Sequence, residues 1–279
     1  MRTVVVGASS GLGRCIGIGL AQRGARVALL ARRLDRLERA AAEAGAGALA
    51  VACDVTNETS VHTAVEEAAS GLGGIDALVY TVGVGHLRRL ADIDAAASEL
   101  GGIDALVYAP AIGPLARLLD LDVDTWRRAF DTNVIGAALV TAAAMPHLSA
   151  AAGRVVYLSS VSASLTPPWP GLGAYVVSKA ALDKLVEAWR AEHADVAFTR
   201  LVVGDAGGGT GESQTGFTAE WDAKLGAELG PIWFQRGLLS GALIEIDDLV
   251  GVIHAILCTG ATASLPSVTV TPRVPKAQG

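Results

Sequence analysis

A tyrosine and a lysine with the spacing Tyr-x-x-x-Lys are the residues best placed to do chemistry together. Tyr175 and Lys179 are one helical turn apart, so on a helix they lie on the same face. A phenol titrates at about pH 10, and a neighbouring ammonium favours the phenolate and lowers that pKa. The spacing therefore predicts a general acid or base, although a chance pairing on an amphipathic helix would look the same.

Two further motifs make a chance pairing the weaker interpretation. Three serines, Ser159, Ser160 and Ser162, follow a predicted strand over 154–158 and precede the tyrosine. A glycine-rich loop with the spacing Gly-x-x-x-Gly-x-Gly lies between a predicted strand over 4–6 and a predicted helix over 12–23. Neither motif is specific alone, but together with the Tyr-x-x-x-Lys spacing they favour a functional site over a chance pairing.

The glycine loop predicts a phosphate site, because its amides lie at the positive end of a helix. Gly7 permits the tight turn, Gly11 lets the backbone approach a pyrophosphate, and Gly13 lets the helix pack closely on the sheet. The residues that we expect to contact a dinucleotide here are Gly7, Ser9, Ser10, Gly11, Leu12 and Gly13.

The end of the second predicted strand, over 27–30, indicates which dinucleotide binds. An acidic side chain usually accepts from the ribose of NAD at this place, and Ala31 provides none. Arg32 and Arg33 can meet a 2′-phosphate with charge-assisted hydrogen bonds. NADP(H) is therefore favoured and NAD(H) is possible, unless the two arginines only begin a charged helix face with Asp35.

The third predicted strand, over 49–52, is followed by Asp54 and Val55. Asp54 can accept a hydrogen bond from the adenine amine, and Val55 lies beside it. Alternatively, Asp54 caps the helix predicted over 60–69.

Short apolar runs alternate with longer helical patterns along the chain. This alternation is typical of a parallel sheet with both faces covered. We therefore predict an α/β fold, a Rossmann-type doubly wound parallel sheet with helices on both faces, in a single domain over 1–279. The other predicted elements are a strand over 197–203, helices over 35–44 and 125–144, and a helix from Tyr175 to about 193.

An internal repeat occupies the middle of the chain, in units of about 73–100 and 101–128. Gly73–Tyr80 recurs residue for residue as Gly101–Tyr108. A doubly wound sheet needs one such strand beside the first, so we expect one copy to be an extra edge strand, a surface excursion or disordered. The second copy leads directly into the helix over 125–144, which favours it as the core strand, although the first keeps a glycine at Gly83 where the second has Ala111.

Composition and charge limit the classes of function. The chain has 279 residues, 51% of them hydrophobic, and a net charge of -6 with a pI of about 5.4. We expect no nucleic-acid partner and no membrane span, because there is neither a basic stripe nor a sufficiently long apolar run. Three distant cysteines and five scattered histidines predict a reduced, cytoplasmic protein without a metal site.

The glycine-rich segment from Gly204 to Gly216 precedes a helical stretch rich in aromatic residues. This combination suits a lid over a pocket, at about 204–240, although a surface loop beside core aromatic residues would read alike. The candidates to line an apolar pocket are Trp169, Phe217, Trp221 and Trp233.

Taken together, these motifs resemble the short-chain dehydrogenase/reductase family over nearly the whole chain. The resemblance adds Asn133, within Phe130–Gly136, to the glycine loop, Asp54, Ser160, Tyr175 and Lys179. It implies NADP(H)-dependent interconversion of a carbonyl and a secondary alcohol on a small apolar substrate. It also implies a homodimer or homotetramer in which the helix over 125–144 and the Tyr175 helix pair between subunits.

The resemblance also implies roles for the four catalytic candidates. Tyr175 is the general acid in reduction and the base in oxidation, and Ser160 hydrogen-bonds the substrate oxygen. Lys179 bonds the nicotinamide ribose and lowers the pKa of the tyrosine, while Asn133 positions a water linked to the lysine. Ser162 has the commoner spacing to Tyr175, but we prefer Ser160 because it ends the strand.

Three segments depart from the family pattern. The Asn-Asn-Ala-Gly motif that the family has after the fourth strand is replaced in both repeat copies. After the sixth strand, Gly204–Asp205 stands where the family usually has Pro-Gly, and the spacing from Ser160 to Tyr175 is longer than usual. With the duplication, these departures favour an alternative function, a catalytically degenerate nucleotide-binding protein that senses or scaffolds. The intact Ser-Tyr-Lys-Asn set favours the enzyme.

Overall fold

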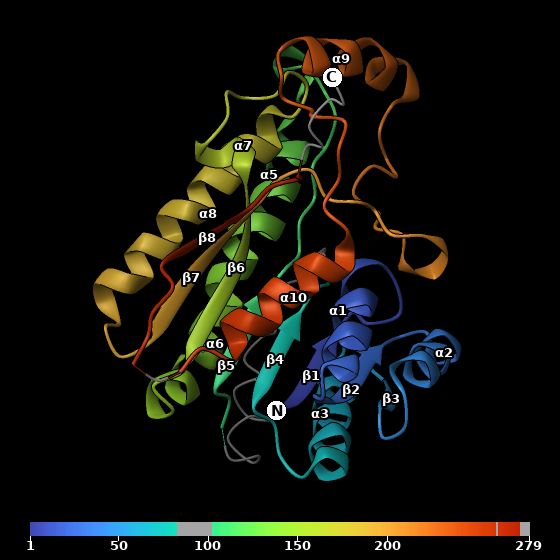
Figure 1. Cartoon of the computed structure of the whole chain (residues 1–279), viewed down its shortest axis with the longest axis vertical. Helices are drawn as coiled ribbons and strands as arrows, with labels where there is room; N and C mark the ends of the chain where they lie inside the picture. Colours follow the sequence, from blue (N-terminus) through green and yellow to red (C-terminus); the bar gives the residue numbers. More distant parts are fainter. Residues whose placement is uncertain (83–101, 261, 274–279) are drawn as a thin grey trace, which may run out of the picture.

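The computed structural model describes residues 1–82, 102–260 and 262–273 of the chain (Figure 1). At its centre lies one sheet of eight parallel strands in the order β3-β2-β1-β4-β5-β6-β7-β8. Strand order runs in opposite directions on the two sides of β1, so the predicted α/β fold with a doubly wound parallel sheet is confirmed. The strands are β1 Arg2–Val6, β2 Arg26–Ala31, β3 Leu49–Ala52, β4 Ala77–Tyr80, β5 Ala105–Tyr108, β6 Arg154–Ser160, β7 Ala197–Val203 and β8 Ser267–Val270.

Helices connect these strands and agree with most of the predicted spans to within a few residues. The α-helices are α1 Gly11–Gln22, α2 Leu34–Ala44, α3 Glu58–Leu72, α5 Val123–Phe130, α6 Gly136–Ala150, α7 Val161–Ser164, α8 Gly173–Glu192, α9 Ala223–Gln235 and α10 Ile246–Leu257. A π-helical turn, η2 Asp131–Ile135, joins α5 to α6, and the 3₁₀ turns are η1 Leu118–Asp120 and η3 Gly211–Ser213.

The sheet separates two hydrophobic layers, because successive side chains of a strand point to opposite faces. On one face, Val4 and Val6 belong to a core completed by α3, α6 and α8. On the other face, Val5 belongs to a core completed by α1, α2 and α10, and α1 and α10 lie side by side (Figure 1). With both faces covered, the carboxyl ends of the strands form an accessible edge, and α9 lies beyond it.

Both copies of the repeat form core strands, so the expectation that one copy is surplus is wrong. β4 lies between β1 and β5, and the two copies pair in register from Ala77↔Ala105 to Tyr80↔Tyr108. All residues of both strands are buried. A four-residue apolar strand fits any interior position of a parallel sheet, since its backbone is paired on both sides and its side chains are apolar on both faces. The glycine at 83 lies outside the described residues.

The pairing of identical sequences places three tyrosines in one row across the sheet. Tyr80, Tyr108 and Tyr157 occupy matching positions of β4, β5 and β6, with ring centroids 6.0 Å and 6.4 Å apart. Such cross-strand aromatic pairs stabilise a sheet. The Tyr108 hydroxyl donates to the Thr132 carbonyl at 2.6 Å, so the second repeat copy also holds the π-helical turn in place.

Within the part of the chain that the structure describes, one helical stretch, Val123–Ala150, is long and apolar enough to cross a membrane. Length and composition are weak evidence, because a core helix of a soluble protein satisfies the same criteria. Here Val140, Ala144 and Leu148 of this stretch are fully buried in the layer on one face of the sheet.

Removal of residues 77–104 tests whether the two copies are interchangeable. The deletion joins Asp76 to Ala105 and leaves one Ala-Leu-Val-Tyr strand, whose register with both β1 and β6 is unchanged. We expect a soluble protein with a single cooperative thermal transition followed by circular dichroism. Loss of the cooperative transition relative to the full chain would show that the sheet needs both strands.

Candidate active site

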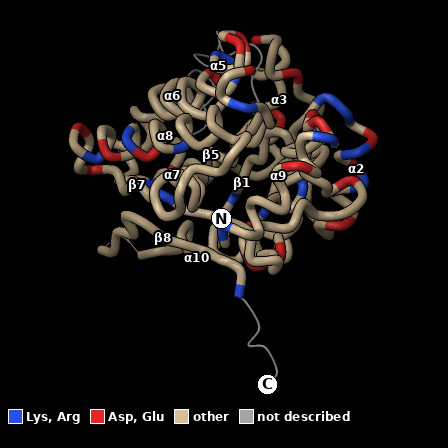
Figure 2. The backbone as a smooth tube through the Cα atoms, turned by 90° about the horizontal axis from the view of Figure 1, so that it is seen from above, with Lys and Arg blue, Asp and Glu red and all other residues tan. Residues whose placement is uncertain are grey.

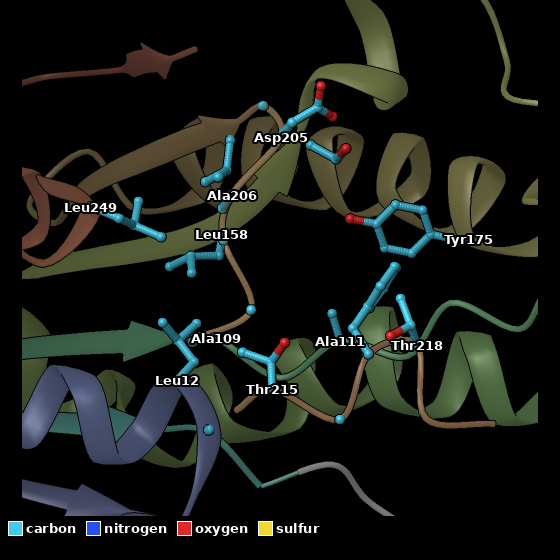
Figure 3. A pocket seen from close by; sticks show the side chains of 18 of the residues that line it. Leu12, Ala109, Ala111, Leu158, Tyr175, Asp205, Ala206, Thr215, Thr218 and Leu249 are labelled. Carbon is cyan, nitrogen blue, oxygen red and sulfur yellow. The ribbon is translucent and has the colours of Figure 1, made fainter. Parts of the chain in front are cut away.

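A cavity of about 760 Å³ lies at the carboxyl ends of the strands (Figure 3). At one end it is lined by Ser10–Gly13 of the glycine loop, and at the other by Ser160, Tyr175 and Lys179. The Tyr175 hydroxyl points into the cavity, and Leu12 lies across it (Figure 3). The fold therefore brings the two predicted motifs, far apart in sequence, to one connected space.

Polar ties fasten α8 to the end of β6. Lys179 Nζ donates to the Leu158 carbonyl at 2.7 Å, and Ser159 Oγ donates to Asp183 Oδ1 at 2.5 Å. Arg200 Nη1 of β7 donates to Asp183 Oδ2 at 3.1 Å. Lys179 and Asp183 are one helical turn apart and almost fully buried, so unpaired charges here would be costly. These ties fix the height of Tyr175 above the strand ends.

Ser160 is the serine that affects the pKa of the tyrosine. It ends β6 and caps the short helix α7, where its Oγ accepts from the Ser162 backbone N–H at 3.2 Å. Its Oγ also lies 2.9 Å from Ser162 Oγ. Both serines line the cavity with Tyr175, and of the two it is Ser160 that lowers the pKa of the phenol. The choice of Ser160 over Ser162 stays a prediction.

The pKa of Tyr175 departs from the sequence-based expectation. Burial raises it above the usual value of a phenol, and the hydrogen bond with Ser160 offsets only part of that rise. Lys179 Nζ lies 6.0 Å from the centroid of the tyrosine ring and donates instead to the Leu158 carbonyl. The expected lowering by the lysine is therefore wrong for this state of the site. A protonated phenol is suited to donate a proton to a carbonyl oxygen.

The pKa of Lys179 is also perturbed. Burial lowers it to about 8, and the charge of Asp183 opposes part of that shift. The pKa of Asp183 itself is raised by burial, although bonds from Ser159 and Arg200 act in the opposite direction. Titratable groups with environment-shifted pKa values gather at functional sites, so this region is a candidate centre of proton chemistry.

Asn133 lies in the π-helical turn, fully buried, and joins two segments of the site. Its Nδ2 donates to the Ile112 carbonyl at 2.9 Å and to Ser178 Oγ at 2.8 Å, and its Oδ1 accepts from the Ile112 N–H at 2.9 Å. Ser178 in turn donates to the Tyr175 carbonyl at 2.7 Å. The side chain thus holds the segment after β5 against α8, and both N–H groups of its amide are used in doing so.

The glycine loop fits a nucleotide phosphate. Gly7 and Gly11 have φ of 91° and 57°, in the left-handed region that favours glycine. A Cβ on Gly13 would lie 2.6 Å from the Gly7 carbonyl oxygen, so only glycine lets α1 begin this close to the loop. Ser10 precedes α1 with an extended backbone and no side-chain cap, which leaves the first amides of the helix free to bind an anion.

The predicted adenosine-side residues Arg32, Arg33, Asp54 and Val55 do not line the cavity, and one of them contacts the glycine loop. Arg33 Nη2 donates to Ser9 Oγ at 3.1 Å and to Ser10 Oγ at 3.0 Å, so its guanidinium already lies against the glycine loop. The pKa of the Asp54 carboxyl is lowered mainly by hydrogen bonds from Thr56 and to a smaller extent by the charge of Arg32, which is exposed.

Asp54 is not the helix cap that the sequence left open. Its Oδ1 accepts from the N–H and the hydroxyl of Thr56, whereas Asn57 caps α3 through the Ser60 N–H. Val55 is half-buried and packs against the core beside α3.

All four aromatic residues that the sequence singled out line the cavity. They form a chain of ring contacts that ends at Tyr175, with centroid distances between 5.1 and 5.9 Å, through Phe217, Trp221, Trp233 and Trp169. The indole N–H of Trp221 donates to the Gly113 carbonyl at 2.7 Å, and that of Trp233 donates to the Pro170 carbonyl at 2.9 Å. With these N–H groups satisfied, this wall presents aromatic surface to a ligand.

Sequence reasoning missed two groups that shape the site. Asp183 continues the Tyr175 and Lys179 face by one more turn, a spacing that could have identified it. Arg14 directly follows the glycine motif and is 5% exposed, with its Nε without a hydrogen-bond partner among the described residues. No sequence signal shows that Arg14 is buried, because arginine is usually exposed.

Replacement of Lys179 with Met tests the buried ammonium. The pKa of Lys179 is lower in the folded chain than in the unfolded chain, so the unfolded chain binds more protons between about pH 8 and pH 10.5. The free energy of unfolding of the wild type, relative to Lys179→Met, should therefore rise across this window by up to about 3 kcal/mol. Urea unfolding at several pH values measures it, and parallel curves for the two proteins would contradict the assignment.

Known proteins share this fold and part of this sequence. The family model described as short chain dehydrogenase matches residues 2–99 and again 91–204, and the overlap lies at the repeat. A glycine betaine reductase of Emericella nidulans is 33% identical over 68% of this chain and 13% of its own length. A short chain dehydrogenase of Pseudocercospora fijiensis is 32% identical over 68% of this chain and 53% of its own length. The chain thus spans about half the length, or less, of these curated relatives.

Solved structures agree with the fold. An alcohol dehydrogenase from the archaeon Thermococcus sibiricus, complexed with 5-hydroxy-NADP, superposes with a TM-score of 0.65 at 20% identity and covers 100% of this chain and 99% of its own. A short-chain dehydrogenase from Streptomyces avermitilis gives a TM-score of 0.65 at 22% identity, over 96% of this chain and 87% of its own. At these identities the structures show the fold alone. Because the family model covers residues 2–204, the chain belongs to the short-chain dehydrogenase family.

Proposed function

We propose that the protein is an NADP(H)-dependent oxidoreductase that interconverts a carbonyl and a secondary alcohol. The observation that carries the proposal is the single cavity that connects the glycine loop with Ser160, Tyr175 and Lys179. A nicotinamide cofactor supplies or accepts the hydride when it is bound there. The fit of the glycine loop to a phosphate and the guanidinium group of Arg33 against Ser9 and Ser10 support a phosphorylated dinucleotide.

In this proposal each side chain has a separate task. Tyr175 Oη holds the proton that passes to the substrate oxygen in reduction, and takes it back in oxidation. Ser160 Oγ, which lines the same cavity as Tyr175, holds the same oxygen. Lys179 ties the catalytic helix to β6 and places a positive charge under the phenol, and Asn133 keeps the helix and the segment after β5 together.

The aromatic wall favours a small apolar carbonyl or alcohol as substrate. Phe217 meets Tyr175 edge-on at 5.1 Å between ring centroids, so apolar surface begins directly beside the proposed acid. An apolar substrate can pack against such a wall without burying a polar group that lacks a hydrogen-bond partner. We also propose a homodimer or homotetramer, because Ile135, Leu139 and Val177 expose apolar side chains on η2, α6 and α8. The three free cysteines favour a reducing, cytoplasmic location.

The inserted strand favours a second candidate function, a nucleotide-binding protein without turnover. Two strands, β4 and β5, separate β1 from β6, so three strand spacings, roughly 14 Å, lie between the strand before the glycine loop and the strand that ends in Ser160. One copy of the repeat would reduce this separation by about 4.8 Å. If the insertion holds the nicotinamide short of Tyr175, deletion of residues 77–104 will raise turnover and leave cofactor affinity little changed.

Replacement of Tyr175 with Phe separates the two candidates. We expect turnover on a panel of apolar ketones and alcohols to fall by about 100-fold or more, because the only change is the loss of the proton donor. Both proteins are titrated with NADPH and then NADH, and binding is followed by energy transfer from the five tryptophans. The variant should bind each cofactor as tightly as the wild type does, and both proteins should bind NADPH more tightly than NADH. NADPH binding without wild-type turnover would favour the second candidate, and binding of neither cofactor would refute both.

The serine pair offers a matched comparison. Ser160→Ala should lower kcat by about 10- to 100-fold, because the substrate oxygen loses a hydrogen bond that strengthens in the transition state. Ser162→Ala, at an equally buried position in the same turn, should change kcat by less than about threefold. The reverse order would assign the substrate bond to Ser162.

A further inference from the structure

Residues 207–218, which we call the strap, cross the glycine loop and reach the proposed acid. The Gln214 carbonyl and the Thr215 backbone lie close to Gly11, since a Cβ added there would be 3.5 Å from each. Gln214–Thr218 line the cavity, and Phe217 contacts Tyr175 edge-on. A change in the position of the strap at the glycine loop would therefore be felt at the phenol.

One carboxylate fastens the strap to α1 and α2. Glu212, in the 3₁₀ turn η3, accepts from Arg39 Nη2 at 2.7 Å and from Arg39 Nε at 3.2 Å. Arg14 Nη2 and Arg36 Nε lie 3.8 Å and 3.9 Å from the same carboxylate. Arg14 Nη1 also donates to Ser213 Oγ at 2.9 Å. Three guanidinium groups from two helices thus converge on one side chain of the strap.

These arginines stand where the ribose end of a dinucleotide would lie. Arg14 follows the glycine motif at the start of α1, and Arg36 and Arg39 lie in the first two turns of α2, directly after Arg32 and Arg33 at the end of β2. Around α2, basic and acidic stretches lie close together (Figure 2). The Arg14 side chain is 6% exposed, and its Nε lacks a hydrogen-bond partner among the described residues, so the cluster has donor capacity left for an anion.

Glu212 and a phosphate monoester would compete for the same donors. Glu212 brings one negative charge and two acceptor oxygens, whereas a phosphate monoester carries about −1.5 to −2 charges and three acceptor oxygens. The ion pairs of Glu212 are partly exposed, with Arg39 and Glu212 side chains 51% and 32% exposed, and such pairs contribute little to stability. Glu43 also pairs with Arg14 at 2.5 Å, and Asp35 pairs with Arg39 at 3.0 Å, so Glu212 is the strap's share of the negative charge around these arginines. A 2′-phosphate is a stronger partner for the arginines than the Glu212 carboxylate.

We propose that Glu212 is an exchangeable counter-ion of Arg14, Arg36 and Arg39, which the 2′-phosphate of NADP(H) displaces, releasing the strap. The inference rests on the proposed NADP(H) site and names a residue that sets its phosphate preference. Binding of the phosphate at one end of the crevice then moves the segment that carries Phe217 at the other end. A dinucleotide without the 2′-phosphate leaves Glu212 in place and the strap fastened.

The experiment uses the full chain with adenosine 2′,5′-bisphosphate and 5′-AMP, which differ only by the 2′-phosphate. Calorimetry gives the dissociation constants, and hydrogen–deuterium exchange of residues 207–218 reports the strap. In the wild type, the bisphosphate should speed exchange of the strap, and 5′-AMP should not. Glu212→Gln should bind the bisphosphate about fivefold or more tightly, because one competing charge is removed, with 5′-AMP affinity unchanged.

Glu220→Gln is the matched control. Glu220 lies just beyond the strap and pairs with Arg128 of α5 at 2.7 Å, away from the arginine cluster, so this variant should behave as the wild type. The proposal would be overturned if Glu212→Gln and the wild type bound the bisphosphate with equal affinity. It would also be overturned if the bisphosphate and 5′-AMP changed the hydrogen–deuterium exchange of the strap to the same extent. Turnover does not enter these readouts, so a protein that binds NADPH without hydride transfer would refute the proposed activity and leave the counter-ion role intact.

Discussion

The site depends on one constraint, the in-register parallel pairing of strands buried on both faces. Because helices cover both faces, ligands reach the sheet at the carboxyl ends of the strands. Parallel pairing brings the ends of β1, β4, β5 and β6 to the same edge, and the loops that follow them line one cavity. The chemistry of the glycine loop and that of Tyr175 meet there because the strands before them are aligned.

Buried charge then fixes α8. Lys179 and Asp183 cannot stay ionised in an apolar layer without partners, and the available partners are the Leu158 carbonyl and Ser159 at the end of β6 and Arg200 in the middle of β7. The same burial that lowers the pKa of Lys179 also raises that of Tyr175. Burial thus acts on both groups in this site, on Lys179 in the contact between α8 and the sheet and on Tyr175 in the cavity wall beside Phe217.

The duplicated strand shows how tolerant that framework is. An apolar strand that is paired on both sides adds to the sheet without leaving an unpaired backbone, and its tyrosine continues a row already present. The added strand also increases the separation between the glycine loop and Ser160, because β4 and β5 both lie between β1 and β6. The strap, fastened by Glu212 at one end and in contact with Tyr175 at the other, spans this widened crevice.

The sequence by itself determined the fold class and predicted that the glycine loop, Ser160, Tyr175 and Lys179 belong to one site, since these follow from local periodicity and short spacings. Tertiary structure decided the rest. Identical segments such as Ala77–Tyr80 and Ala105–Tyr108 have identical local preferences, so only sheet pairing could show that both are core strands. Likewise, burial raises the pKa of Tyr175 although Lys179 is one helical turn away, and Glu212 meets arginines about 170 to 200 residues away. Burial and long-range ion pairs are properties of the packed chain, which residue types and spacings do not encode locally.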